Sequence, residues 1–169
     1  MHRDLRPLIV LGPAIKPATR AIMQANRGRN TGPEMLVRRA LHDAGVRYRL
    51  HVGNLPGRPD IVLRSRRIII DVRGCFWHGH DCDNHGTPKI RSEFWTKKLQ
   101  LNRDRDNRNE AALRELGWQV LILWECTLNE ARAEEIAKIT KAIGTDSRSA
   151  LTKTELTRYI ANLTTRPAA

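Results

Sequence analysis

The pattern of apolar and polar residues divides the middle of the chain into helices and short strands. Residues 36–44 carry apolar side chains at helical spacing, a capping-box sequence at 31–34 precedes them and Gly45 follows. This predicts a helix with a defined start and end. Residues 46–52 then alternate apolar and polar, as a half-buried strand does, with His51 among the polar positions.

Two short β-branched runs, 60–63 and 68–70, are close enough in sequence to form a hairpin. The apolar run 119–124 predicts a strand that is buried on both faces if it is central in the sheet. Helices are expected over three further ranges: 94–116, 130–143 and 152–163. This order of elements predicts a single α/β domain with a mixed central β-sheet flanked by helices.

The charge of the chain narrows the choice of partner. Among 169 residues, 30 Lys and Arg stand against 18 Asp and Glu, which gives a formal net charge of +12. Nucleic acid explains this excess better than an anionic membrane does, because each neutralised phosphate releases counterions. No stretch approaches the roughly 20 apolar residues of a membrane span. We expect residues 1–18 to form an N-terminal tail.

The run 74–82 concentrates two thiols, two imidazoles and two aromatic rings. The three cysteines of the chain cannot all pair with one another, so a metal in a reduced, cytoplasmic protein is a simpler interpretation than a disulfide framework. A closed, tetrahedral, structural Zn²⁺ would suit four residues: Cys75, His80, Cys82 and Cys126. Asp81 and His85 compete with His80 as ligands, and His78 is left as a candidate general base.

Carboxylates gather at one end of the predicted hairpin. Asp60 begins one strand, and Asp71, Val72 and Arg73 end the other. Oxygen ligands of this kind hold Mg²⁺, which polarises a phosphate. If Asp60 lies opposite Val72, however, its side chain points to the other face from Asp71, and a bulge or a shifted register is needed to unite them. Glu34 is a further candidate carboxylate.

Five motifs stand at intervals along the chain: Leu55–Asp60 (LPGRPD), Gly74–His78 (GCFWH), Glu93–Trp95 (EFW), Gly117–Trp118 (GW) and Trp124–Cys126 (WEC). Together they resemble the very short patch repair (Vsr-type) endonucleases, zinc-containing nicking enzymes that cut next to the thymine of a T:G mismatch. The resemblance covers residues 19–128 and implies a restriction-endonuclease-like, PD-(D/E)xK-related fold with catalytic Mg²⁺ and structural Zn²⁺. Residues 129–169 are then a C-terminal helical extension packed on the core.

The resemblance also implies roles for individual residues. Asp60 falls on the Mg²⁺-binding aspartate, His78 on the histidine that activates water, and Glu34 on an acidic residue that supports it. The carbonyl of Val72 is a further metal contact, and the four candidate zinc ligands match those of the family. The residues implied in DNA binding are the aromatic wedge (Phe76 and Trp77), Met23 of an N-terminal arm, its neighbours Arg20, Asn26, Arg27 and Arg29, and Asn102 near the active site.

The chain departs from the family pattern at Val72 and Arg73, where the family has a hydroxyl residue and a histidine, and at Asp71, where an apolar residue is expected. Arginine cannot serve as a base or a neutral ligand, but it clamps phosphate and offsets charge. We therefore expect Asp71 to be an additional metal ligand and Arg73 to contact the scissile phosphate. The alternative is a structural salt bridge between the two at the strand end.

Three functions remain open at this point. The first is a Mg²⁺-dependent nickase of T:G-mismatched duplex DNA. The second is a Vsr-related nuclease of restriction or phage defence that cuts specific or modified DNA, and the third is a non-catalytic zinc module that only binds DNA. The first would act as a monomer in the bacterial cytoplasm, associated with the nucleoid, with other repair factors as further partners.

Overall fold

The computed structural model describes residues 28–82, 88 and 91–142 of the chain. Several predictions concern residues outside these ranges: the tail at 1–18, the helix at 152–163, His85, and the arm residues Arg20, Met23, Asn26 and Arg27. The division into tail, core and extension stays a prediction. None of the described helices combines the length and the apolar character that a bilayer-spanning helix needs.

Within the described ranges, four strands form one sheet in the order β1-β2-β3-β4. They are β1 (Arg49–Leu50), β2 (Ile61–Leu63), β3 (Ile68–Arg73) and β4 (Gln119–Trp124). The β1–β2 and β2–β3 pairs are antiparallel, whereas β3 and β4 are parallel. The predicted single α/β domain with a mixed sheet is therefore confirmed. Among the described residues β4 pairs only with β3, so it lies at the edge of the sheet and not in its centre.

The first strand is shorter than the alternation over 46–52 predicted. The backbone of His51, directly after β1, has a φ of 45° in the left-handed region. Extended pairing cannot continue through such a residue, so the strand ends at Leu50.

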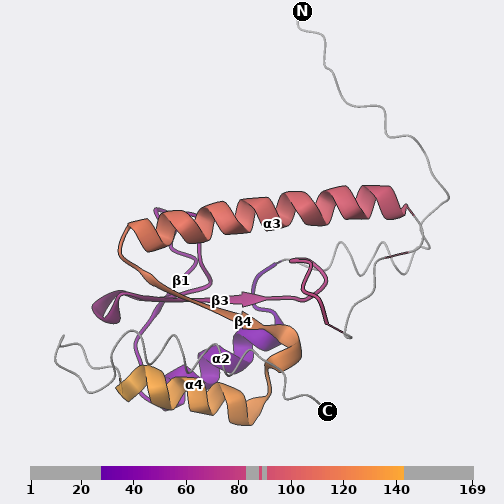
Figure 1. Ribbon diagram of the computed structural model, residues 1–169. Helices are drawn as coiled ribbons and strands as arrows, with labels where there is room; N and C mark the ends of the chain where they lie inside the picture. Colours follow the sequence, from indigo (N-terminus) through magenta and orange to yellow (C-terminus); the bar gives the residue numbers. More distant parts are fainter. Residues whose placement is uncertain (1–27, 83–87, 89–90, 143–169) are drawn as a thin grey trace, which may run out of the picture.

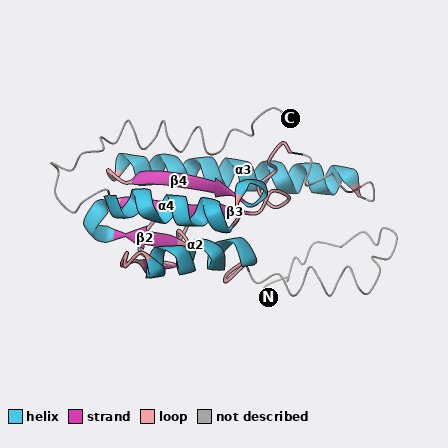
Figure 2. Ribbon diagram, turned by 90° about the horizontal axis from the view of Figure 1, so that it is seen from below, coloured by secondary structure: helices cyan, strands magenta, loops and turns pink. Residues whose placement is uncertain are grey.

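Helices cover both faces of the sheet (Figure 1). They are α2 (Gly32–Asp43), α3 (Ser92–Glu115) and α4 (Glu130–Ala142). Short 3₁₀ turns also follow two of the strands, at Arg64–Arg66 after β2 and at Glu125–Thr127 after β4. The long α3 lies on one face of the sheet, and α2 and α4 lie side by side on the other (Figures 1 and 2). The main hydrophobic core fills the space between the sheet and α2 and α4, and a smaller one lies under α3.

The register of the hairpin decides where the carboxylates meet. Leu63 pairs with Ile68 and Ile61 pairs with Ile70, so the same register, continued by one residue, sets Asp60 opposite Asp71. The shifted register expected as one way to unite the carboxylates is therefore present, because the connection between Leu63 and Ile68 sets a pairing one residue away from the one assumed, and no bulge is needed to bring Asp60 opposite Asp71. The start of β2 and the ends of β3 and β4 meet at one edge of the sheet, and the functional candidates gather there.

Candidate active site

A cleft of about 840 Å³ opens at this edge of the sheet. Its walls come from the start of α2, the loop before β2, the end of β3 and the middle of α3. Five cationic side chains line it together with the candidate carboxylates: Arg29, Arg58, Arg73, Lys98 and Arg105. All of these except Arg73 are exposed. A polyanion that enters the cleft therefore meets positive charge around an acidic centre.

Asp60 lines the cleft at the start of β2. Its Oδ2 accepts a hydrogen bond of 2.9 Å from the Val72 N–H, which ties the start of β2 to the end of β3. Burial raises the pKa of this carboxyl from its ordinary 3.8 to about 7, the charge of Asp71 adds to the rise, and the Val72 N–H opposes it. A bound divalent cation would favour the ionised form of both carboxylates. The donor set therefore fits Mg²⁺, as the sequence predicted.

Glu34 reaches the same centre from the first turn of α2. The helix begins as predicted, because the Thr31 Oγ1 accepts a hydrogen bond of 3.4 Å from the Glu34 N–H. The Glu34 side chain is only 2% exposed and accepts from the Asn30 N–H at 2.6 Å. Ligand atoms of Glu34, His51 and Asp60 lie within 4.8 Å of one another. The structure thus brings Glu34 to Asp60, together with His51, which the alternation over 46–52 had placed at a polar position of the predicted strand.

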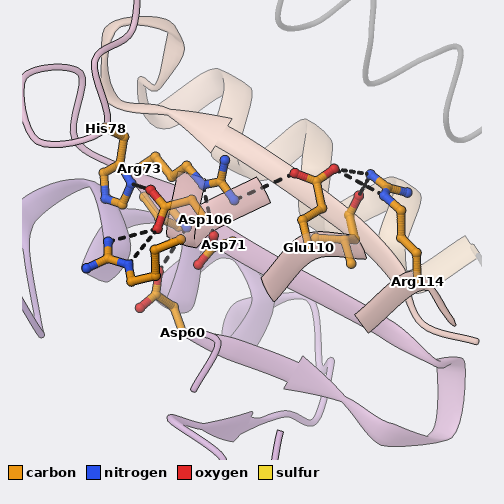
Figure 3. A network of polar contacts seen from close by, with 10 residues as sticks. Asp60, Asp71, Arg73, His78, Asp106, Glu110 and Arg114 are labelled. Carbon is orange, nitrogen blue, oxygen red and sulfur yellow. Dashed lines mark hydrogen bonds and ion pairs between the residues drawn. The ribbon is translucent and has the colours of Figure 1, made fainter. Parts of the chain in front are cut away.

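Arg73 and Asp71 face each other at the end of β3 (Figure 3). The Arg73 Nε donates to the Asp71 Oδ2 at 2.9 Å, and its Nη2 lies 3.7 Å from the Glu110 Oε2. Arg73 is 6% exposed, and Glu110 in turn pairs with Arg114. The salt bridge that the sequence offered as the alternative is therefore present. Contact of Arg73 with the scissile phosphate stays a prediction.

His78 is held by a carboxylate from α3. Its Nδ1 lies 2.6 Å from the Asp106 Oδ2, and the other oxygen of Asp106 accepts from the Arg105 Nη2 at 2.8 Å (Figure 3). Burial alone would raise the pKa of Asp106, but the hydrogen bonds from His78 and Arg105 outweigh it and lower that pKa below its ordinary 3.8. An ionised Asp106 orients the imidazole and keeps the proton on its Nδ1.

The four predicted zinc ligands come together in the structure. Their donor atoms lie within 4.8 Å of one another: Cys75, His80, Cys82 and Cys126. The Cys126 Sγ lies 3.4 Å from the His80 Nδ1, and the His80 ring stacks on Trp124 with ring centres 4.2 Å apart. Burial raises the pKa of the Cys75 thiol to about 12, a cost that a bound cation reverses, because it binds the thiolate. Three sulfurs and one imidazole fit Zn²⁺.

The aromatic wedge adjoins the cleft, because Trp77 is one of the residues that line it. The Phe76 ring meets the rings of Trp77 and Trp95 edge-on, at centre distances of 5.0 and 5.2 Å. Asn102 on α3 is 8% exposed and donates from Nδ2 to the Trp77 carbonyl at 2.9 Å. Asn102 therefore holds the backbone of the wedge, and its predicted contact with DNA is not tested by this arrangement.

Comparison with known proteins decides the family. The family described as DNA mismatch endonuclease Vsr matches residues 14–84. The chain is 50% identical over 116 residues to the type II nicking enzyme V.XorIIP of Xanthomonas oryzae pv. oryzae, which covers 69% of this chain and 85% of that protein. The chain belongs to the DNA mismatch endonuclease Vsr family.

Two further relatives agree with this assignment. The DNA mismatch endonuclease Vsr of Escherichia coli K12 is 43% identical over 106 residues, 63% of this chain and 68% of that protein. The type II nicking enzyme V.NmeAIP of Neisseria meningitidis is 39% identical over 115 residues, 68% of this chain and 82% of that protein. The resemblance inferred from the motifs is thus confirmed, and this Vsr-family protein is a DNA endonuclease.

Two polar residues of this Vsr-family site escaped the sequence prediction. Asp106 stands among charged residues of the sequence and was not a candidate site residue, yet it is 8% exposed. A signal existed, because the buried positions of α3 follow one helical face: Trp95, Leu99, Asn102, Asp106 and Leu113. A carboxylate in such a stripe needs a partner. His51 left no comparable signal, because a left-handed backbone turns it away from the course of the strand.

Proposed function

We propose that this Vsr-family endonuclease is a Mg²⁺-dependent nickase that hydrolyses the phosphodiester next to the mismatched thymine of a T:G pair in duplex DNA. The observation that carries the proposal is the His78–Asp106 pair, with 2.6 Å between Nδ1 and Oδ2, in the same cationic cleft as Asp60. A histidine oriented by a buried carboxylate can act as a general base, and a divalent cation held by the acidic side chains beside it can stabilise the charge of a phosphodiester during hydrolysis. The names of the relatives, which include nicking enzymes and a mismatch endonuclease, support the choice of substrate.

In this proposal His78 removes the proton from the attacking water. Because the Nδ1–H of His78 is directed to Asp106, the lone pair of the neutral ring is on Nε2, which accepts the proton. Asp106 is ionised at neutral pH, since its pKa is lowered. It therefore stabilises the imidazolium that forms, as the third member of a catalytic triad does.

The acidic centre has a separate task. Asp60, Asp71 and the carbonyl of Val72 would hold Mg²⁺, which, when bound, supplies Lewis-acid stabilisation to the negatively charged phosphate. Arg73 holds the Asp71 carboxylate in place through its Nε. Because its Nη2 lies at the longer distance of 3.7 Å from Glu110, part of the guanidinium remains for the predicted contact with the scissile phosphate.

Recognition is assigned to the wedge and to the cationic rim of the cleft. Side chains that intercalate unstack a base step in exchange for a bent duplex, and a mismatched step resists them less. Phe76 and Trp77 are half-buried, and the backbone of Trp77 is bonded to Asn102, which holds the pair at one place. Exposed Arg29 lies at the rim, and the N-terminal arm, outside the described residues, would continue from there.

We also propose a fold family, a structural metal and an oligomeric state for the chain. The sheet and helices form a restriction-endonuclease-like fold with Zn²⁺ at the cysteine cluster, over a core of residues 19–128. The protein acts on DNA as a monomer. Other repair factors are candidate partners.

A panel of labelled duplexes tests the function. The zinc-loaded full chain is incubated with Mg²⁺ and matched, T:G-mismatched or base-modified duplexes of one sequence, and with a supercoiled plasmid. We expect a single nick beside the mismatched thymine and none in the matched duplex. Asp60→Ala should abolish it while DNA binding persists, and His78→Ala should slow it by about 10²–10⁴-fold. The control is His42→Ala, an exposed histidine in the last turn of α2.

The alternatives give different results in the same panel. Cleavage of matched or modified duplexes at a rate equal to that of the T:G duplex indicates a nuclease of restriction or phage defence. DNA binding without any nick in the presence of Mg²⁺ indicates a non-catalytic zinc module.

A further inference from the structure

Four charged side chains form a continuous line of contacts from the end of β3 to α3 (Figure 3). They are Asp71, Arg73, Glu110 and Arg114, two anions and two cations. Glu110 precedes Arg114 by four residues on α3, the order that favours an ion pair across one helical turn. The four charges cancel, so the line as a whole does not attract DNA into the cleft. Its effect is therefore local and depends on how each side chain is held.

Arg73 is held on three sides. Its Nε donates to the Asp71 Oδ2 at 2.9 Å. Its guanidinium lies over the ring of Trp124, the residue opposite it on β4, with 5.9 Å between Cζ and the ring centre. Its Nη2 faces the Glu110 Oε2 at 3.7 Å, which is too long for a hydrogen bond. Within the described ranges neither Nη nitrogen makes a hydrogen bond, and Arg73 lines the cleft, so these two groups can meet a ligand there.

Glu110 is shared between two arginines. Its Oε1 accepts hydrogen bonds from the Arg114 Nε at 3.1 Å and Nη2 at 2.8 Å, and the same Nη2 donates to the Val120 carbonyl of β4 at 3.1 Å. The Oε2 of Glu110 is left to face Arg73. Because Arg114 holds the carboxylate from the other side, Glu110 attracts the guanidinium of Arg73 without closing on it. Arg73 is thus drawn toward Asp71 in one direction and toward Glu110 in the other.

We propose that Glu110, held by Arg114, is a positioning residue that directs the Nη groups of Arg73 at the scissile phosphate. Arginine binds a phosphate best through two parallel N–H groups, so the direction of the guanidinium plane decides whether both can reach it. Without the charge of Glu110, the guanidinium can turn to give both Nε and Nη2 to Asp71, and its Nη edge then leaves its place in the cleft. The inference rests on the proposed function, because it gives Glu110 a part in the same cleavage.

Two other roles for Glu110 give different results. As a simple brace between α3 and the sheet, it would affect stability and leave the nicking rate of the folded protein unchanged. As a competitor that withholds Arg73 from DNA, its removal would raise that rate. A positioning role gives a third pattern, in which removal of the charge lowers the rate but does not weaken DNA binding, because one negative charge leaves the cleft.

A matched pair of variants separates these roles. Glu110→Gln keeps the size of the side chain and removes its charge, and Glu115→Gln makes the same change at an exposed glutamate of α3. Single-turnover nicking of the T:G duplex is measured with the zinc-loaded full chain and Mg²⁺ at saturating enzyme, and affinity for the duplex is measured separately. We expect Glu110→Gln to bind at least as tightly as Glu115→Gln but to nick about 10²-fold more slowly, as a displacement of about 1 Å does. Glu115→Gln should nick at the parent rate.

The Arg73→Lys background shows whether Glu110 acts through Arg73. An ammonium has no fork to direct, so Glu110→Gln should slow Arg73→Lys by less than about 2-fold, whereas independent effects would add. The proposal is overturned if Glu110→Gln nicks as fast as Glu115→Gln or faster, or if it slows the parent and Arg73→Lys by the same factor. Equal nicking of matched and T:G duplexes by the parent would reject the mismatch specificity alone, because either duplex then reports the effect of Glu110. A parent that nicks neither duplex would reject the proposed function and this inference together.

Discussion

Replacing the carboxylate behind His78 tests the proposed chemistry most directly. Asp106→Asn keeps the size of the side chain but removes the charge that faces the His78 Nδ1 at 2.6 Å. The amide can also donate to that nitrogen, which moves the proton of the imidazole to Nε2 and leaves no lone pair for water. We expect the nicking rate to fall by about 10²–10⁴-fold, the contribution of a general base, or about 3–5 kcal/mol of transition-state stabilisation.

The chain offers a matched control on the same helix. Asp104 is exposed, and its Oδ1 accepts from the Gln100 Nε2 at 2.9 Å. Asp104→Asn removes the same charge from α3 without touching His78, so both variants change the attraction for DNA alike. Any difference between them reports on orientation of the imidazole and not on net charge.

The assay is single-turnover nicking of a labelled T:G duplex at saturating enzyme, with Mg²⁺, over a range of pH. Asp106→Asn should bind the duplex like Asp104→Asn but cut it far more slowly, and His78→Ala should be as slow. Thermal unfolding shows whether the variant remains folded. The reasoning is refuted if Asp106→Asn cuts at the rate of Asp104→Asn while His78→Ala is slow, because His78 would then act without its carboxylate.

Four further predictions concern the two metal sites and the wedge. Cys126→Ala should lose zinc in elemental analysis and lower Tm by more than about 10 °C, since each kcal/mol shifts Tm by about 2–4 °C in a chain of this size; a variant that retains zinc would contradict the ligand set. The pKa of Asp60 is raised from 3.8 to about 7, so without Mg²⁺ its contribution lowers stability as pH rises through that window. Asp60→Asn should therefore have a higher Tm than the parent, and the difference in Tm should grow with pH. A difference that does not change with pH would contradict the raised pKa of Asp60. Arg73→Ala should cost about 1–3 kcal/mol of stability, because the carboxylates that it leaves unpaired, Asp71 and Glu110, are partly exposed. It should also lose most of the nicking rate, whereas Arg73→Lys should retain part of it; nicking by Arg73→Ala at the parent rate would limit the arginine to a structural role. Phe76→Ala with Trp77→Ala should erase the preference for T:G over matched duplexes in competition binding more than it reduces non-specific affinity, and an equal loss on both would indicate a core role.

Structural features that are set by residues close together in the chain were predictable from the sequence of this protein. The helix after Thr31 begins at its capping residue, and the hairpin forms where two β-branched runs are separated by a short turn. The cluster of three cysteines and His80 was predicted for a different reason. Cysteine is the residue that binds zinc through sulfur, and the chain has three cysteines, so the candidate donor set is restricted before any fold is known.

The tertiary structure alone decided how the acidic centre is assembled. A shift of one residue in the register reverses the face of every side chain in a strand, and only the observed pairing of Ile61 with Ile70 sets Asp60 opposite Asp71. The positive φ of His51 had an equally large effect, because it ends β1 and the imidazole then lies with Glu34 and Asp60. Asp106 became a partner of His78 because α3 crosses the sheet with that face inward. These placements depend on how segments far apart in the chain pack together. The apolar periods of strands and helices, two and 3.6 residues, describe single elements and therefore do not predict that packing.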